Sequence, residues 1–315
     1  MTQKKDMGKI LRQFGLIFVA LFIILVMSFL SPVFLTSQNI TNILRQISLN
    51  GILSVGMTFV ILTGGIDLSV GSVVAIAGVI SGSMMANGTN WFVSCIAALV
   101  LAVICGLING WLISYIEFQP FIATLSTMTI GRGMALAYSD GKPYTITDES
   151  FIQIGQGAVF GIPVPIILLI LFCAAGLVIL NMTTFGRYVF AIGGNKNAAR
   201  LSGVRTRRIQ MAVYVISSIC AWMVGLILAA RISSGQPIAG ESYEMDAIAA
   251  TAIGGTSMNG GIGSLTGTIF GFILLGLLNN SMNLMNINSF YQQIVKGLLI
   301  ILAVFLDMRT KGKKN

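Results

Sequence analysis

The stretch from Asn181 to Gln210, NMTTFGRYVFAIGGNKNAARLSGVRTRRIQ, separates two long apolar runs and decides how the rest of the chain is oriented. It contains no acidic residue and six basic ones: Arg187, Lys196, Arg200, Arg205, Arg207 and Arg208. Loops rich in Lys and Arg stay on the cytoplasmic side of a membrane protein. Because this loop is long enough to hold a short helix, we interpret it as a cytoplasmic docking surface for a soluble partner.

The composition indicates a chain whose solvent is mostly lipid. It is 55% hydrophobic and 9% charged, with a mean hydropathy of +0.88, whereas soluble domains are about 25% charged. The net charge of +9 lies at the ends and in one loop, which indicates orientation in a membrane rather than binding to nucleic acid. Four cysteines fall in apolar runs, where we expect no disulfide: Cys95, Cys105, Cys173 and Cys220.

The sequence gives no sign of an enzyme. It contains no His, which removes the commonest general base and metal ligand. We therefore expect no catalytic, cofactor or metal site. An intramembrane protease of the aspartyl type would need two membrane carboxylates, and only Asp67 is evident.

Apolar runs of about twenty residues predict helices that span the membrane. The clear spans are Phe14–Leu30, Trp91–Ile116, Phe121–Tyr138, Pro165–Leu180, Met211–Ala230 and Phe290–Leu306. The first is interpreted as a span rather than a signal peptide, because no small-residue cleavage site follows it. Next comes Val33–Gln46, with helical spacing of its isoleucines, which predicts an interfacial helix. The apolar stretch Ile47–Ala86 is interrupted at Thr63–Ser72, which predicts two helices meeting at a glycine break.

Charge in the loops orients these spans. The polar segments Ser139–Pro163 and Arg231–Asp246 are rich in acids and are expected outside, whereas both chain ends, including Asp307–Asn315, are basic and expected in the cytoplasm. The number of crossings is then even. Within residues 247–280 the short apolar pieces either both cross, giving ten segments, or form a re-entrant hairpin beside eight full spans. The expected fold is one all-α polytopic membrane domain over residues 1–315, with eight to ten transmembrane or half-spanning helices.

Two segments resemble each other: VILTGGIDLSVGS (Val60–Ser72) and TAIGGTSMNGGIGS (Thr251–Ser264). Glycine-broken segments in corresponding places of two halves point to a transport pathway, because backbone groups freed there can face a substrate. Close helix packing through small residues explains the same pattern. The pathway candidates are Gly64, Gly65, Asp67, Ser69, Gly254, Gly255 and Asn279.

Asp67 and Arg132 are charges that the sequence predicts to be buried. A carboxylate at membrane depth costs about 2.5–3.5 kcal/mol, so Asp67 is expected to face a cavity or a partner, or to act as the N-cap of the helix that follows. Both roles are compatible. Arg132 lies near the end of a predicted span and is expected to extend its side chain to the membrane surface.

Four motifs carry a family resemblance: GMTFVILTGGIDLSVGSVVAIAG (56–78), FGRYVFAIGGNKNAARLSGV (185–204), SSGQPIAGESYEMDAIAATAIGGTSMNGGIGS (233–264) and YQQIVKG (291–297). Together they resemble the membrane permeases of bacterial sugar ABC importers, most of all ribose permeases, within a group that includes xylose, galactose, autoinducer-2 and branched-chain amino-acid permeases. The resemblance implies a homodimeric pore in the bacterial inner membrane. It also implies an extracytoplasmic sugar-binding protein and a separate cytoplasmic ATPase that binds the ATP.

The basic loop fits this resemblance. Asn197-Ala198-Ala199 followed by Gly203 is similar to the importer coupling motif, although Asn stands where that motif has Glu and its later Leu-Pro is missing. Asn195 is a predicted N-cap for a short helix after a glycine pair. The coupling candidates are Gly193, Gly194, Asn195, Asn197, Ala198, Ala199, Arg200 and Gly203. A basic loop attracted only to anionic lipid headgroups is the alternative.

A secondary transporter or channel for a small polar solute is the alternative function, since glycine-broken helices suit it equally. Such proteins place coupling-ion carboxylates or His in several spans, and this chain offers almost none. The sequence does not name the sugar, because a pore of this kind passes what its binding protein delivers.

Overall fold

The structure is a computed structural model that describes residues 3–312, with side chains described for residues 15–302 and for Phe305. Residues 1–2 and the end of the predicted basic tail, 313–315, lie outside the described residues. The helices are α1 (Gln3–Leu30), α2 (Ser37–Leu62), α3 (Val70–Ala86), α4 (Trp91–Ser114), α5 (Pro120–Ser139), α6 (Glu149–Gln156), α7 (Val164–Met182), α8 (Thr184–Gly194), α9 (Lys196–Leu201), α10 (Thr206–Ile232), α11 (Tyr243–Ile253), α12 (Leu265–Leu284) and α13 (Ser289–Gly312). Strand β1 (Tyr144–Thr145) pairs antiparallel with β4 (Ser234–Gly235), and β2 (Ala158–Val159) with β3 (Ile162–Pro163).

Within the described residues, five helices are long and apolar enough to cross a membrane: α2, α4, α7, α10 and α12. Shorter apolar helices lie in α1, α3 and α13. The most apolar helices, α4 and α7, expose most of their surface, whereas α2 is mostly buried. This difference follows from composition, because α2 contains Gly, Ser and Thr, which let neighbouring helices approach closely. The chain is thus an all-α polytopic membrane protein.

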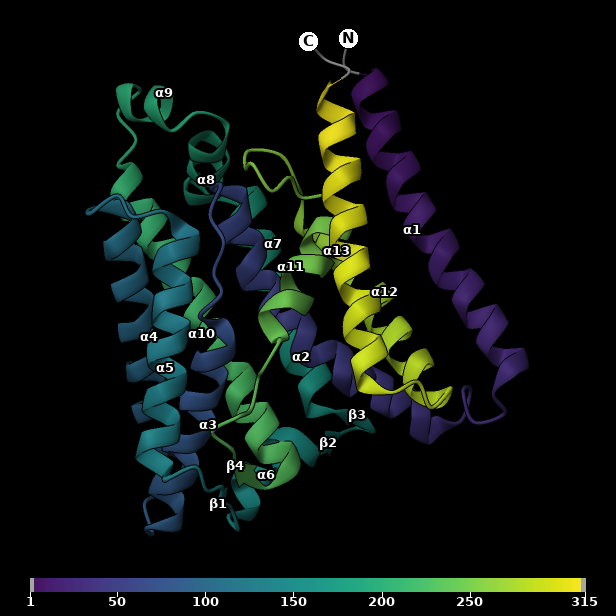
Figure 1. The fold of residues 1–315 in the computed structure, drawn as a ribbon, viewed down its shortest axis with the longest axis vertical. Helices are drawn as coiled ribbons and strands as arrows, with labels where there is room; N and C mark the ends of the chain where they lie inside the picture. Colours follow the sequence, from purple (N-terminus) through teal and green to yellow (C-terminus); the bar gives the residue numbers. More distant parts are fainter. Residues whose placement is uncertain (1–2, 313–315) are drawn as a thin grey trace.

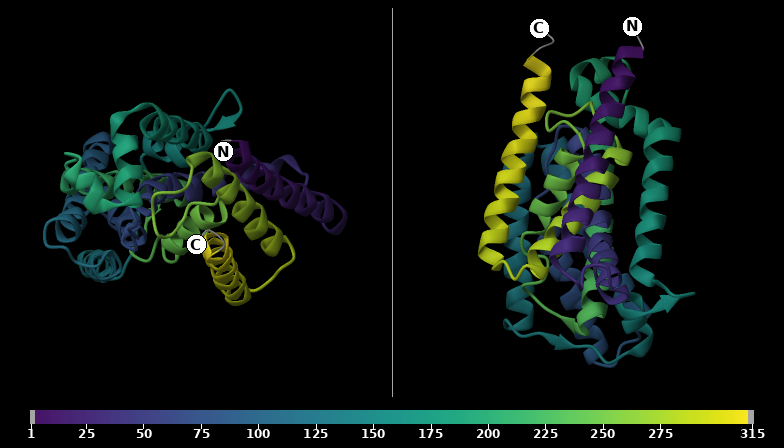
Figure 2. Two further views of the ribbon diagram at one scale, coloured as in Figure 1. Left: turned by 90° about the horizontal axis from the view of Figure 1, so that it is seen from above. Right: turned by 90° about the vertical axis from the view of Figure 1, so that its right-hand side faces the viewer.

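The bundle is built around α2 and α10. Helix α10 packs against α2, α3 and α4, while α2 also packs against α7, α11 and α12. Figure 1 shows α4 and α5 at one side of the molecule and α1, α12 and α13 at the other. Helix α1 begins and α13 ends at the end of the molecule that carries α8 and α9, and the strands lie at the opposite end (Figures 1 and 2). We call these the α8–α9 end and the strand end.

The separate interfacial helix predicted over Val33–Gln46 is wrong. Helix α2 begins at Ser37, with the hydroxyl of Thr36 accepting a hydrogen bond from the Asn39 backbone, and runs without a break to Leu62. The reason is packing: Ile43 is buried in the core, and Asn39 exchanges side-chain hydrogen bonds with Asn280 of α12, at 2.8 and 3.2 Å. A segment anchored to the bundle in this way is part of the core rather than a helix lying on lipid.

Residues 247–280 turn back on themselves at the loop between α11 and α12. The backbone N–H of Gly261, in the loop between α11 and α12, donates to the Leu62 carbonyl at 2.9 Å, beside the C-terminus of α8. Asn280, near the other end of α12, contacts Asn39 at the start of α2. Helix α11, with 11 residues, starts close to Asn50 in the middle of α2 and leads up to this loop, and α12, with 20 residues, forms a longer antiparallel leg.

Candidate functional site

The first glycine break lies where the sequence predicted it. Helix α2 ends at Leu62 and α3 starts at Val70, so residues 63–69 leave helical geometry. Gly64 has a φ of +80°, which an L side chain rarely adopts. Gly65 packs against the hydroxyl of Tyr214 on α10, which is buried without a hydrogen-bond partner.

Asp67 is fully buried at the centre of a polar network. Its Oδ1 accepts hydrogen bonds from the backbone N–H and the hydroxyl of Ser69, at 3.0 and 2.6 Å, and its Oδ2 accepts from the Ser217 hydroxyl at 2.7 Å. The network continues through Asn109, which donates to Ser69 at 2.8 Å and accepts from Thr127 at 2.7 Å. It therefore ties the break to α4, α5 and α10.

The N-cap prediction for Asp67 needs correction. The residue at the N-cap position of α3 is Ser69, and no side chain caps that helix. Asp67 instead satisfies the backbone N–H of Ser69, one residue before the helix begins. Its carboxyl group accepts from three donors, and no cation among the described side chains pairs with it.

Arg132 does not extend to the membrane surface as predicted. One terminal nitrogen of its guanidinium donates to the carbonyl oxygens of Pro237 and Ala239, both at 2.7 Å, and the other donates to Gly71 at 3.3 Å. A guanidinium presents several donors in a fixed planar arrangement, so it can bind three carbonyls that a surface-directed side chain would leave unpaired. Arg132 thus links α5 and α3 to the segment before α11.

The second break combines two kinds of glycine. Gly254 caps α11 and lies against the backbone of Gly267 on α12, so close helix packing accounts for it. Gly255 has a φ of +92°, which marks the departure from helical geometry. Asn279 lies roughly 21 Å further along α12 than its first residue, Leu265, and is not brought to this break. Its side chain is buried, and its Oδ1 has no hydrogen-bond partner.

The basic loop folds as two short helices at the α8–α9 end (Figure 1). Asn195 is the N-cap of α9, as predicted: its side-chain oxygen accepts from the Ala198 backbone at 2.9 Å. Lys196, Asn197, Ala198 and Arg200 are exposed. Gly203, with a φ of +84°, turns the chain towards α10.

Ala199 and Leu201 of α9 differ in solvent exposure, which the sequence did not reveal. Ala199 is buried against its own chain, with 6% of its surface exposed, so it supports the helix rather than presenting a contact. Leu201 is 86% exposed beside the basic residues and was not predicted as a site residue. An exposed leucine on a cationic helix is a suitable anchor for a protein groove.

Next to α9 lies a groove of about 300 Å³ between this helix and the α4–α5 turn. Arg207 lies in its wall, with its guanidinium 5.5 Å from the centre of the Tyr115 ring and 3.8 Å from the Glu117 carboxylate. These contacts are half exposed and contribute little stability. They join the start of α10 to the turn between α4 and α5.

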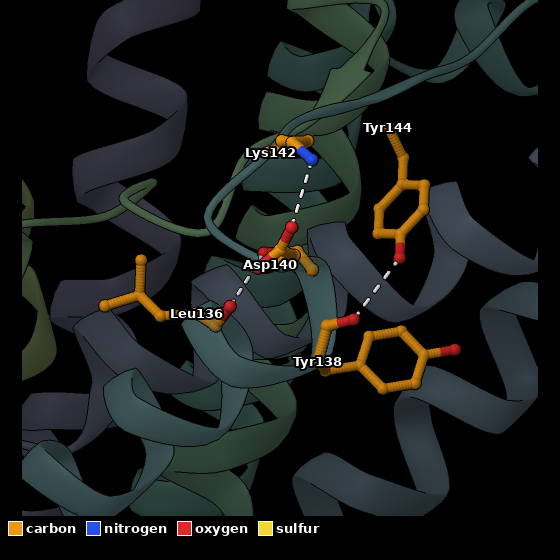
Figure 3. A network of polar contacts seen from close by, with 6 residues as sticks. Leu136, Tyr138, Asp140, Lys142 and Tyr144 are labelled. Carbon is orange, nitrogen blue, oxygen red and sulfur yellow. Dashed lines mark hydrogen bonds and ion pairs between the residues drawn. The ribbon is translucent and has the colours of Figure 1, made fainter.

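At the strand end, α5 passes into the acidic loop that Figure 3 shows. Lys142 pairs with Asp140 at 3.0 Å, and the Tyr144 hydroxyl donates to the Tyr138 carbonyl at 3.4 Å. Both charged side chains are largely exposed. Acidic, solvent-facing loops at the end opposite α8 and α9 agree with the charge asymmetry of the sequence.

The structure brings together glycines from three distant parts of the sequence. Gly64 of the first break lies against Gly260 of the second break, and Gly193 of the basic loop lies against both Gly260 and Gly261. The cluster containing Gly260 and Gly261 was recognised in the sequence, but neither was named as a site residue. Their positive φ values, +82° and +73°, are those of a turn. The sequence does not show which other segment packs against that turn.

The structure has interrupted helices with a buried polar network between them and a basic helical loop at one end. These features define the class of protein, which is a polytopic membrane transport protein. Comparison with protein families matches residues 39–304 to the family described as "Branched-chain amino acid transport system / permease component". The chain belongs to this family. It is a multi-pass permease of the inner membrane.

Individual relatives match over almost their whole length. The ribose import permease protein RbsC of Bacillus subtilis (strain 168) is 45% identical over 295 residues, which cover 93% of this chain and 92% of the relative. RbsC of Escherichia coli (strain K12) is 43% identical over 291 residues, covering 91% of each. The L-arabinose transport system permease protein AraH of the same strain is 40% identical over 309 residues, covering 98% and 94%. No solved structure gives a significant match.

Proposed function

We propose that this chain is the permease subunit of an ATP-driven sugar importer, with ribose as the sugar. The observation that carries the proposal is the match to ribose import permeases along more than nine tenths of the chain. A separate ATPase binds and hydrolyses the ATP, and an extracytoplasmic binding protein delivers the sugar. The permease itself supplies the passage and is not an enzyme.

We propose ten crossings, with both termini in the cytoplasm. The chain passes from β4 at the strand end through α11 to the glycine loop at the α8–α9 end and returns along α12, which supports this count (Figure 1). The basic charge of the α8–α9 end and the acidic loops of the strand end support the orientation. Two copies of the chain form the pore, as the family resemblance implies, so a purified complex should contain two permease chains.

The ATPase docks on α9 at the cytoplasmic end. Leu201 provides an exposed apolar anchor, and Lys196, Asn197 and Arg200 surround it with polar and cationic groups. The glycine breaks with Asp67 and Ser69 form the moving part of the pathway, because segments without regular helical hydrogen bonds can change shape at low cost.

The test is reconstitution of the chain with its ATPase and binding protein in vesicles. Uptake of labelled ribose should require ATP and the binding protein, and labelled arabinose and xylose serve as competitors. Uptake that proceeds without ATP would indicate a secondary transporter or channel instead.

The variant Leu201→Asp tests whether the ATPase docks on α9. It should weaken co-purification of the ATPase while the chain still inserts. Phe160→Asp is the matched control, because Phe160 is fully exposed in the β2–β3 turn, far from the α8–α9 end (Figure 1). If Leu201→Asp binds the ATPase as tightly as the control does, α9 is not the docking helix.

A further inference from the structure

Three chain segments that are far apart in sequence meet at the α8–α9 end without any side chain between them. They are the C-terminus of α2, the C-terminus of α8, and the loop 257–262 between α11 and α12. The loop is a closed turn, since the Ser257 N–H donates to the Ile262 carbonyl at 2.8 Å and the Gly260 N–H donates to the Ser257 carbonyl at 2.9 Å. Its Gly261 N–H donates to the Leu62 carbonyl at 2.9 Å.

The closeness of the backbones requires glycine at Gly193, Gly260 and Gly261, and a φ of +80° favours it at Gly64. A Cβ on Gly193 would overlap the Leu62 carbonyl and the Gly261 N–H. A Cβ on Gly260 would lie 2.7 Å from the Gly64 nitrogen and 3.0 Å from the Gly193 Cα. We call Gly64, Gly193, Gly260 and Gly261 the glycine junction.

The glycine junction lies between α9, which is the proposed coupling helix, and both glycine breaks. Gly193 and Gly194 end α8, and the next residue, Asn195, is the N-cap of α9. Gly64 starts the first break, and Gly260 and Gly261 belong to the second. Backbone-to-backbone contacts of this kind have no rotatable side chain that could absorb a displacement.

We propose that the glycine junction transmits motion of the ATPase-docking helix to both interrupted helices at once, with Gly193 as the key positioning residue. This inference rests on the proposed function. When α9 moves with the ATPase, α8 displaces the 257–262 loop and the start of the first break as one unit. The two halves of the pathway therefore move together rather than one after the other.

Small residues also pack membrane helices without moving anything, so the test needs a readout that packing alone does not change. Gly193→Ala and Gly194→Ala form a matched pair. The two are adjacent on α8, but a Cβ on Gly194 would meet nothing within 4 Å. Both variants are assembled with the ATPase and the binding protein in vesicles, and assembly, ATP hydrolysis and ribose uptake are measured.

Gly193→Ala should assemble and hydrolyse ATP, but it should lose stimulation by the binding protein, and its uptake should fall at least about tenfold, which is the effect expected of overpacking at such a contact. Gly194→Ala should behave as the wild type. Wild-type uptake by assembled Gly193→Ala would overturn the proposal, as would equal losses in both variants. Absence of ATP-driven uptake in the wild type would overturn the proposed function instead.

Hydrogen exchange on the unmodified complex tests the proposal even where Gly193→Ala fails to assemble. The peptide covering 257–262 should remain protected both without nucleotide and in the vanadate-trapped state, because the Gly261 amide stays bonded to Leu62 as the unit moves. Exchange around α9 should differ between the two states. Loss of protection of 257–262 in either state would show that the junction opens, and it would refute a rigid linkage.

Discussion

Replacing Asp67 by Asn and by Leu separates its hydrogen bonds from its charge. All three groups that contact its carboxylate in the structure are hydrogen-bond donors from Ser69 and Ser217. In Asp67→Asn the side-chain oxygen can still accept both bonds from Ser69. The new amide can donate to the Ser217 hydroxyl, whose own proton is free to turn to a helix carbonyl.

The two substitutions should change the free energy of unfolding differently. Asp67→Leu leaves the N–H and the hydroxyl of Ser69 buried without their acceptor, at about 1–3 kcal/mol each, so we expect its free energy of unfolding to lie about 2–6 kcal/mol below that of Asp67→Asn. Asp67→Asn keeps these bonds and removes a buried charge that costs about 2.5–3.5 kcal/mol to insert. It should therefore be as stable as the wild type, or more stable.

The assay is thermal unfolding of the purified chain in detergent, followed by ribose uptake in the assembled complex. Asp67→Leu should unfold several degrees below Asp67→Asn, which should unfold at or above the wild type and transport at a similar rate. Asp140→Asn is the control, because that carboxylate is exposed at the strand end. A stably folded Asp67→Asn complex without uptake would refute the reasoning, since the negative charge itself would then be needed.

The topology predicts that cysteine at Thr147 is labelled from outside and cysteine at Lys196 only from the cytoplasm; the opposite result would overturn the orientation. Lys296→Met should lower the free energy of unfolding by about 3–5 kcal/mol, because it removes the cation whose nitrogen lies 2.8 and 2.9 Å from the two carboxylate oxygens of buried Asp246. Adding Asp246→Asn should restore most of this loss. A double variant that is no more stable than Lys296→Met would contradict the pairing. Arg132→Lys should lower the thermal unfolding midpoint, because one ammonium cannot reach all three carbonyls; an unchanged midpoint would contradict this role.

Much of the fold could be predicted because lipid imposes simple rules. Apolar length located α4, α5, α7 and α10 to within a few residues at most ends, and the glycine break before α3 fell at the predicted place. The interfacial helix failed because Val33–Gln46 looks amphipathic in isolation. Its pairing partner, Asn280, lies 241 residues from Asn39, and no local pattern reveals such a contact.

In the candidate site, features that depend on local sequence could be predicted, and features that depend on tertiary packing could not. The N-cap at Asn195 depends on local chemistry and was found, whereas the burial of Ala199 and the exposure of Leu201 depend on how α9 lies against the bundle. Asn109 could have been found, because an amide within an apolar span is costly and marks a buried network. Ser217 gave no such signal, because a serine in a membrane helix can bond to its own backbone.

The glycines show most clearly where inference from sequence ends. A glycine tells the reader that something approaches closely or that φ is positive, but it does not say what approaches. Gly193 and Gly194 are indistinguishable in sequence, yet only at Gly193 would an added Cβ meet the backbone of Leu62 and Gly261. The difference arises because residues 62, 193 and 261 meet only after α2, α8 and the loop before α12 have packed. The coupling of the two breaks is thus a property of tertiary structure, although each break on its own is visible in the sequence.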